Sequence, residues 1–178
     1  MIDYGLLNDS ELYYGEKGFV RVEVPWMVSQ YVDQLTKPSH QQSYVIEHNQ
    51  KALVASAEQS FLFQYLKNYL PKGQFQAITP CFRHEQFDAL HSNTFMKNEL
   101  IKTDVVDLNA LDFVVDTALI FYRKYLPNAE VVKTPEGYDI QINGTELGSY
   151  GIRSRSFLDW IFGTGCAEPR TSNSIKYY

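Results

Sequence analysis

The sequence predicts an α+β fold in which a largely antiparallel sheet is flanked by helices. Two segments, residues 57–70 and 111–125, place apolar residues at intervals of three and four, which is the spacing of a buried helix face. The strand candidates 129–133, 138–142 and 146–152 follow one another with only short turns between them. Strands joined by tight turns rather than by helices pair in the antiparallel direction, so the helices should cover the sheet.

The N-terminal third contains weaker signals. Helical spacing up to Tyr14 is poor and predicts a short helix or an irregular arm. Residues 19–24 alternate apolar and polar side chains and end at a proline, as a half-buried strand does. Residues 26–35 are helix-like, and residues 53–55 are a short strand candidate in front of the helix at 57–70.

The middle of the chain predicts a hairpin. Residues 75–83 and 93–102 have strand character and are separated by roughly ten residues, which favours antiparallel pairing. Asp107 or Asn109 can cap the helix that follows. A last strand is expected at residues 156–162.

Composition sets limits on the kind of protein. A chain of 178 residues with 44% hydrophobic residues can bury a full core as one domain. No apolar run approaches the roughly 18 to 20 residues that span a bilayer, and the N-terminus lacks a signal-peptide layout. We therefore expect a cytoplasmic protein with no membrane partner. Cys81 and Cys166 lie far apart, which indicates two reduced, structural thiols rather than a disulfide framework or a metal site.

The charge bears on nucleic-acid partners. The net charge is −5 and the pI is near 5.3, whereas a protein that binds RNA by itself usually presents a basic face. Strong autonomous RNA binding is not indicated. A local basic patch remains open, and its candidate members are Lys97, Lys102, Arg123, Lys124 and Lys133.

The first candidate site spans the end of strand 75–83 and the start of strand 93–102. Arg83 offers a guanidinium fork that can bind a phosphate and a carboxylate together. Glu85 follows two residues later on the same strand face, where it can accept from an adenine amino group. Phe95 offers an aromatic face for a base. The alternative is a surface Arg–Glu pair beside a core phenylalanine.

The second candidate site is the run of residues 163–170. Gly163 and Gly165 carry no side chain and can let the backbone approach a nucleotide closely. Pro169 fits the first turn of a helix, and Arg170 would then lie at a helix N-terminus, where backbone N–H groups favour a phosphate. The alternative is a glycine turn that leads into a short terminal helix.

Together the two sites resemble motifs 2 and 3 of class II aminoacyl-tRNA synthetases. Residues 18–26 resemble motif 1, which in that family builds the dimer interface, and residues 56–58 (Ser-Ala-Glu) resemble its T-x-E loop. Residues 146–149 resemble its E-x-x-S element. The resemblance implies a class II synthetase-like antiparallel sheet flanked by helices, in one catalytic domain over residues 1–178 without an anticodon-binding or coiled-coil domain. It also implies a homodimer through residues 18–26.

The resemblance assigns a role in ATP chemistry to each of these positions. Arg83 and Arg170 would be catalytic, and Glu146 and Ser149 would bind the Mg²⁺ on ATP. His91 would face the γ-phosphate. The complete set implied in ATP binding is Arg83, Glu85, His91, Phe95, Glu146, Ser149, Gly163, Gly165 and Arg170.

Within the class, the seryl-like subgroup fits best. Residues 94–102 resemble its Q-F-x-K-x-E-L, and residues 163–171 resemble its G-[ST]-G-L-A-x-x-R. The implied amino acid ligands are Ser56, Glu58 and Glu99, with Glu58 on the α-amino group. Some relatives hold a zinc through two cysteines and a glutamate, but the intact Ser-Ala-Glu argues against it, so we expect ATP and Mg²⁺ and no zinc.

The resulting hypothesis is ATP-dependent activation of an amino acid as its aminoacyl adenylate. The partners are then ATP, an amino acid and a second copy of the chain, with a tRNA or another molecule as possible acceptor. The position of the seryl-type asparagine corresponds to Ile152, so serine itself is not indicated. The alternative is a catalytically silent paralogue that acts as a nucleotide-binding or regulatory subunit.

Overall fold

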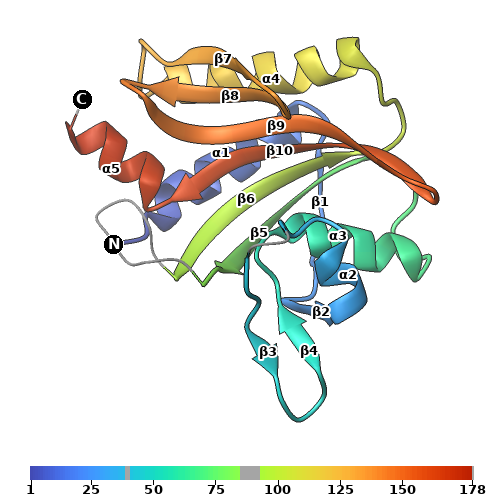
Figure 1. The fold of residues 1–178 in the computed structure, drawn as a ribbon. Coiled ribbons are helices and arrows are strands. Elements are labelled where there is room, and N and C mark those ends of the chain that lie inside the picture. The colour runs from blue at the N-terminus through green and yellow to red at the C-terminus, as the bar shows by residue number, and fades with distance from the viewer. Residues whose placement is uncertain (39–40, 85–92, 178) are drawn as a thin grey trace.

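The computed structural model describes residues 1–38, 41–84 and 93–177, and its centre is a seven-stranded sheet with helices on both faces (Figure 1). In order across the sheet, the strands are β1 (Val20–Arg21), β5 (Gln74–Phe82), β6 (Thr94–Lys102), β10 (Leu158–Glu168), β9 (Thr145–Arg155), β8 (Gly137–Ile142) and β7 (Glu130–Thr134). All neighbours in this sheet pair antiparallel except β1 and β5. The predicted α+β class is confirmed.

Two helices, α1 (Tyr4–Glu16) and α4 (Leu108–Arg123), pack on one face of the sheet. The Asp107 side chain caps α4 by accepting from the Ala110 N–H at 2.8 Å, as one of the two expected caps. The first helix is longer and better packed than its weak spacing suggested. Its Tyr14 is fully buried and donates its hydroxyl to the Gly165 carbonyl at 2.9 Å, so tertiary contacts stabilise it.

The opposite face carries α3 (Ala57–Leu66), α2 (Gln30–Gln34) and a second, small sheet. That sheet has the strand order β2 (Met27–Ser29), β4 (Lys51–Leu53) and β3 (Val45–Ile46), and the β3–β4 hairpin extends away from the rest of the protein in Figure 1. The chain ends in α5 (Arg170–Tyr177), beside β10 and β9. The layer that contains α3, α2 and the small sheet forms one wall of the site described below.

Several elements differ from the sequence prediction. The strand expected at 19–24 pairs in the ladder only at Val20–Arg21, because the chain leaves the sheet after the Val22 N–H bonds to Gln76 O at 3.0 Å. The helix expected at 26–35 begins instead as the strand Met27–Ser29, which pairs with Lys51–Leu53. Long-range pairing explains both errors, since neither partner segment is close in the sequence.

The last strand is also longer than expected, because β10 continues through residues 163–168 instead of turning at the glycines. A side chain at Gly163 would meet the Tyr150 ring at 2.8 Å, and one at Gly165 would meet the Tyr14 ring at 2.9 Å. The missing side chains therefore allow two buried tyrosines to pack directly on the strand. The glycine turn considered as the alternative is wrong.

Candidate active site

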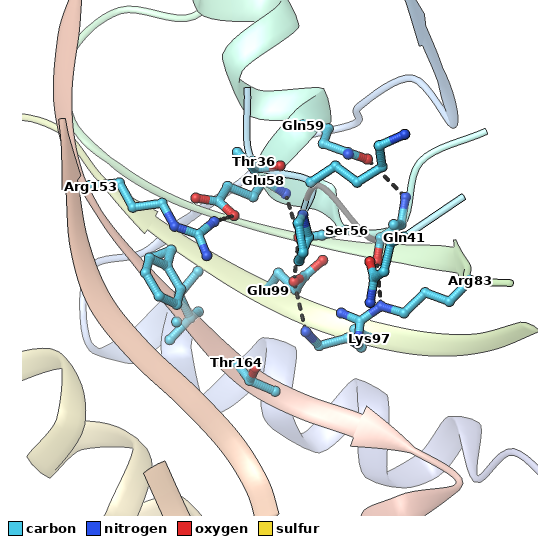
Figure 2. Close-up of a pocket in the computed structure, with 16 residues that line it drawn as sticks. Thr36, Gln41, Ser56, Glu58, Gln59, Arg83, Lys97, Glu99, Arg153 and Thr164 are labelled. Carbon is cyan, nitrogen blue, oxygen red and sulfur yellow. Dashed lines mark hydrogen bonds and ion pairs between the residues drawn. The ribbon is translucent and has the colours of Figure 1, made fainter. Parts of the chain in front are cut away.

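A cavity of about 160 Å³ lies where α3 and the segment before it meet the sheet (Figure 2). Its floor comes from β6 and β10, one end from β9, and the other end from Arg83, the residue that follows β5. Residues 36–38 and Gln41 form the wall on the side of the small sheet. Most of the described lining side chains are polar or charged, and the cationic ones among them are Lys37, Arg83, Lys97 and Arg153.

Glu99 and Ser56 lie at the centre of this pocket. Ser56 caps α3 by accepting from the Glu58 N–H at 3.1 Å, and it donates to Glu99 Oε1 at 2.8 Å. Lys97 Nζ bonds to the same Glu99 oxygen at 2.8 Å, and the Ala57 N–H donates to the other oxygen. Burial alone would raise the pKa of Glu99, but Lys97 and these hydrogen bonds hold the pKa below its ordinary value. Glu99 is therefore a carboxylate fixed in its charged form.

Glu58 projects into the pocket from the first turn of α3. Its Oε1 accepts from Trp160 Nε1 at 2.6 Å, and its Oε2 accepts from Arg153 Nη1 at 2.5 Å. Burial raises the pKa of Glu58, and the positive charge of Arg153 limits the rise. Both predicted carboxylates thus face the same cavity, and each oxygen of Glu58 has a donor.

Arg83 lines the end of the pocket opposite Arg153, and its guanidinium stacks on the ring of Phe95. Its Nε donates to the Ala55 carbonyl at 3.2 Å, and its guanidinium carbon lies 5.1 Å from the centroid of the Phe95 ring. Arg83 directly follows β5, where its N–H bonds to the Asn93 carbonyl at 3.0 Å, and Phe95 lies in the paired strand β6, so the hairpin sets their distance. Two other predicted members of the ATP site, Glu85 and His91, lie outside the described residues.

The predicted residues near the C-terminus form a second cluster that does not line this pocket. Arg170 Nη1 lies 3.1 Å from Glu146 Oε1 and 3.3 Å from the Glu146 carbonyl. Ser149 stands opposite Asp139 across the β8–β9 pair. Burial raises the pKa of Asp139, and the negative charge of Glu146 raises it further. The sequence indicated Glu146, Ser149 and Arg170 but missed Asp139.

The donor set of this second cluster fits Mg²⁺. Carboxylate and hydroxyl oxygens are the hard ligands that Mg²⁺ takes, usually one or two from the protein together with phosphates and water. Burial is the larger cause of the raised pKa of Asp139, and the negative charge of Glu146, the second cause, is one that a divalent cation would neutralise. Among the described residues, no group of three or more His, Cys, Asp or Glu side chains is placed to hold a metal without other ligands.

The two predicted glycines are placed differently relative to the pocket. Gly163 lines it with its backbone, between Phe162 and Thr164, while Gly165 lies beyond it.

Cys81 is buried next to the site, with its sulfur 3.8 Å from Glu99 Oε2, and burial raises the pKa of its thiol to about 12. Cys81 is therefore a protonated thiol and does not behave as a nucleophile at neutral pH.

Three residues at the site had no place in the prediction: Lys97 and Arg153, which line the pocket, and Trp160, which bonds to Glu58 from behind it. Lys97 was a candidate for a surface patch, but its position on β6 buries it beside Glu99, with 9% of the residue exposed. The patch is thus wrong at this residue. Arg153 and Trp160 are paired across β9 and β10, and only that register shows that both reach Glu58. A period-two reading of the predicted strand 146–152 puts the apolar Tyr150 and Ile152 on one face and Arg153 on the other, so it gives no sign of this pocket.

Comparison with known proteins shows which fold this is. Pyrrolysyl-tRNA synthetase from Desulfitobacterium hafniense superposes with a TM-score of 0.76 at 17% identity, over 97% of this chain and 69% of that one. Seryl-tRNA synthetase from Pyrococcus horikoshii, complexed with ATP, gives 0.79 at 19% identity, over 97% of this chain and 49% of that one. Serine-tRNA ligase from Naegleria fowleri, in complex with AMP, superposes with a TM-score of 0.67 at 13% identity, over 93% of this chain and 51% of that one.

The fold is therefore that of class II aminoacyl-tRNA synthetase catalytic domains, which confirms the structural side of the resemblance. The chain spans about two thirds of the pyrrolysyl enzyme and about half of each seryl enzyme. No protein-family model matches the chain, and no curated protein matches it in sequence. Among the described residues, no helix is both long and apolar enough to cross a membrane.

Proposed function

We propose that this protein binds ATP and activates an amino acid as its aminoacyl adenylate. The observation that carries the proposal is the convergence of Arg83, Ser56, Glu58 and Glu99 on one pocket of a synthetase fold. These residues were selected from the sequence for this chemistry, and they come from three separate segments of the chain. A chance assembly of four such residues around one cavity is a weaker account of the same geometry.

The proposed reaction needs charge stabilisation more than proton transfer. A carboxylate oxygen of the amino acid attacks the α-phosphorus of ATP, an O–P bond forms, and pyrophosphate leaves with the electron pair of the broken bond. Arg83 can bind the carboxylate and the α-phosphate together, which brings the reacting atoms into position and balances the charge that develops. Phe95 supports the Arg83 guanidinium and presents its ring to the base.

Arg170 is proposed to bind the departing phosphates from the first residue of α5. Its contact with Glu146 lies at the surface, with 25% of the Arg170 side chain and 45% of the Glu146 side chain exposed, so the guanidinium can exchange this partner for a phosphate at small cost. Glu146 and Ser149, with Asp139 beside them, would hold the Mg²⁺ that screens the charge on the triphosphate. In this proposal the cation and Arg170 lie close together, because Arg170 contacts Glu146.

The amino acid is proposed to lie between Arg83 and the Ser56–Glu58 loop. Glu58 supplies negative charge for its ammonium group, and Glu99 with Ser56 fixes the shape of the wall. An acceptor of the activated acid must then follow. The structural neighbours are tRNA synthetases, so we propose a tRNA as the first acceptor to test, by gel shift at two salt concentrations. Phosphate contacts weaken as salt rises, and a salt-independent shift or no shift would reject tRNA.

A second copy of the chain is the proposed partner at residues 18–26. Val20 is 58% exposed at the edge strand β1 and Trp26 is 56% exposed just before β2. Large exposed apolar side chains next to an unpaired strand edge are typical of an interface. A homodimer through this surface would cover both.

One observation favours a second candidate, a nucleotide-binding subunit without activation chemistry. Both Glu58 oxygens and both Glu99 oxygens already have donors within the protein, so the pocket is satisfied without an amino acid. Such a subunit would bind ATP through Arg83 and Arg170 and would not form an adenylate.

Exchange of labelled pyrophosphate into ATP, measured with each of the twenty amino acids, separates the two candidates. Amino-acid-dependent exchange is the expected result. ATP binding by calorimetry without exchange for any amino acid would favour the silent subunit, and the absence of both would reject ATP chemistry altogether.

A further inference from the structure

The end of the pocket opposite Arg83 is formed by Arg153, a residue that the proposed activation chemistry does not use. Figure 2 shows the Arg153 side chain entering the cavity from β9 while Arg83 enters from the other side. The Arg153 side chain is 27% exposed, so most of it lies inside the protein. A guanidinium inside a substrate pocket presents several N–H donors to whatever occupies it.

Three neighbours fix this guanidinium in place. Its Nη1 bonds to Glu58 Oε2 at 2.5 Å, and its Cζ lies 4.2 Å from the centroid of the Phe162 ring. Trp160, its cross-strand partner, holds the other oxygen of Glu58. Gly151 makes room for the Phe162 ring, because a side chain there would meet the ring at 2.8 Å. The position of Arg153 is therefore set by packing and is not a freely rotating surface conformation.

The charge at this end of the pocket is already balanced. Within the described part of the chain, Arg153 makes ion pairs with Glu58 and, at 3.7 Å, with the largely exposed Glu136. Glu99 and Lys97 form their own pair further along the floor. Arg153 consequently offers hydrogen-bond donors at an end of the pocket where its own charge is already balanced. An uncharged oxygen acceptor fits such a site better than a third carboxylate.

We propose that Arg153 is the specificity-determining residue of the pocket, and that it selects an amino acid whose side chain carries an uncharged oxygen, as a hydroxyl or a carboxamide. This inference rests on the proposed activation of an amino acid. An apolar side chain of the same size would leave the Arg153 donors without an acceptor, which polar sites reject strongly. A cationic side chain would be repelled by the guanidinium, and a carboxylate would face Glu58 and Glu136.

The test compares near-isosteric amino acids in the pyrophosphate exchange assay. Threonine with valine and asparagine with leucine differ in the presence of the oxygen, and asparagine with aspartate differs in charge. We expect the wild type to prefer the oxygen-bearing member in at least one of the first two pairs, and asparagine over aspartate. Arg153→Met should lower the preference for the oxygen by about tenfold or more, through the KM of the amino acid, while the KM of ATP stays the same.

Two further variants make the result specific. Arg155→Met removes an arginine from the same strand that does not line the pocket, and its preferences should match the wild type. Arg153→Met leaves the buried Glu58 without its cation and can fail to fold. The double variant Glu58→Gln/Arg153→Met and the conservative Arg153→Lys are therefore measured beside it. Thermal unfolding of each variant is the control for folding. Arg153→Lys should retain part of the preference.

The outcomes separate the two proposals. Exchange with a preference that Arg153→Met and the double variant leave unchanged overturns the inference and leaves amino acid activation standing. A preference for aspartate over asparagine, or for valine and leucine over their oxygen-bearing counterparts, also overturns it. No exchange with any amino acid removes the proposed function and the inference together.

Discussion

Ser56 and Glu99 are joined by a hydrogen bond of 2.8 Å between Ser56 Oγ and Glu99 Oε1. The first residue caps α3 and the second lies in β6, so this bond attaches the loop before α3 to the floor of the pocket. The Ala57 N–H and Lys97 complete the contacts of the same carboxylate. The shape of the proposed amino acid site therefore depends on one buried charge.

Replacing Glu99 with glutamine should destabilise the protein by about 3 kcal/mol, because it leaves the ammonium group of Lys97 buried without its counter-ion. The loss should depend on pH. Lys97 and the hydrogen bonds hold the pKa of Glu99 below the ordinary value of 4.5 despite its burial, so its contribution is complete above that pH and is lost as the pH falls through the lower folded-state pKa.

Urea unfolding of the wild type and of Glu99→Gln, at a series of pH values, checks this prediction. The difference in the free energy of unfolding should narrow on acidification below the ordinary pKa. The pKa of Glu58 is raised mainly by burial, so its own contribution changes with the opposite sign. Both proteins share that burial, so most of the Glu58 contribution cancels in the comparison, and only the smaller part that comes from the charge of Glu99 does not. A difference that stays constant with pH would contradict the assignment to Glu99.

Arg83→Ala should lower kcat/KM for pyrophosphate exchange, because Arg83 is proposed to bind the reacting carboxylate and phosphate. The expected loss of transition-state stabilisation is about 2 to 4 kcal/mol. Arg83→Lys should recover only part of it, since an ammonium group lacks the planar fork. Arg155→Ala, which changes an exposed arginine that does not line the pocket, serves as the matched control. A loss of less than tenfold in Arg83→Ala would remove this residue from the mechanism.

Arg170→Ala should change stability and activity by very different amounts. Its ion pair with Glu146 is exposed, and such pairs contribute less than about 1 kcal/mol to folding. Its proposed contact with the phosphates predicts a much larger decrease in exchange and in ATP affinity. Thermal unfolding and calorimetry on Arg170→Ala and Glu146→Gln measure both quantities. Equal losses of stability and of activity would indicate a purely structural pair.

Trp26→Asp, alone and with Val20→Asp, should convert a dimer into a monomer, because a charge on either side chain would be buried in the proposed interface. Sedimentation velocity over a range of concentrations gives the oligomeric state. Tyr69→Asp, which changes an exposed aromatic residue elsewhere, is the control. A wild type that is monomeric at all concentrations would reject the interface.

Gly165→Ala should destabilise the protein by about 1 to 3 kcal/mol, because the new methyl group would lie 2.9 Å from the Tyr14 ring and 3.0 Å from the Asn98 carbonyl. Gly15→Ala in α1 is the matched contrast, since its nearest neighbour is 3.8 Å away and alanine favours a helix. Chemical denaturation should therefore show opposite signs for the two variants. A neutral Gly165→Ala would show that β10 does not need the glycine.

The sequence by itself determined the fold class, the β5–β6 hairpin, helices α3 and α4, and the residues Arg83, Ser56, Glu58 and Glu99 that meet in the pocket. These features depend on local periodicity, turn residues and short motifs, which the sequence displays directly. Only the tertiary structure decided the boundaries of β1 and β2 and the course of β10 through its glycines, because those depend on strand partners distant in the chain. It also decided that Arg153 and Trp160 hold Glu58, since cross-strand register brings together side chains whose separation in sequence carries no such information.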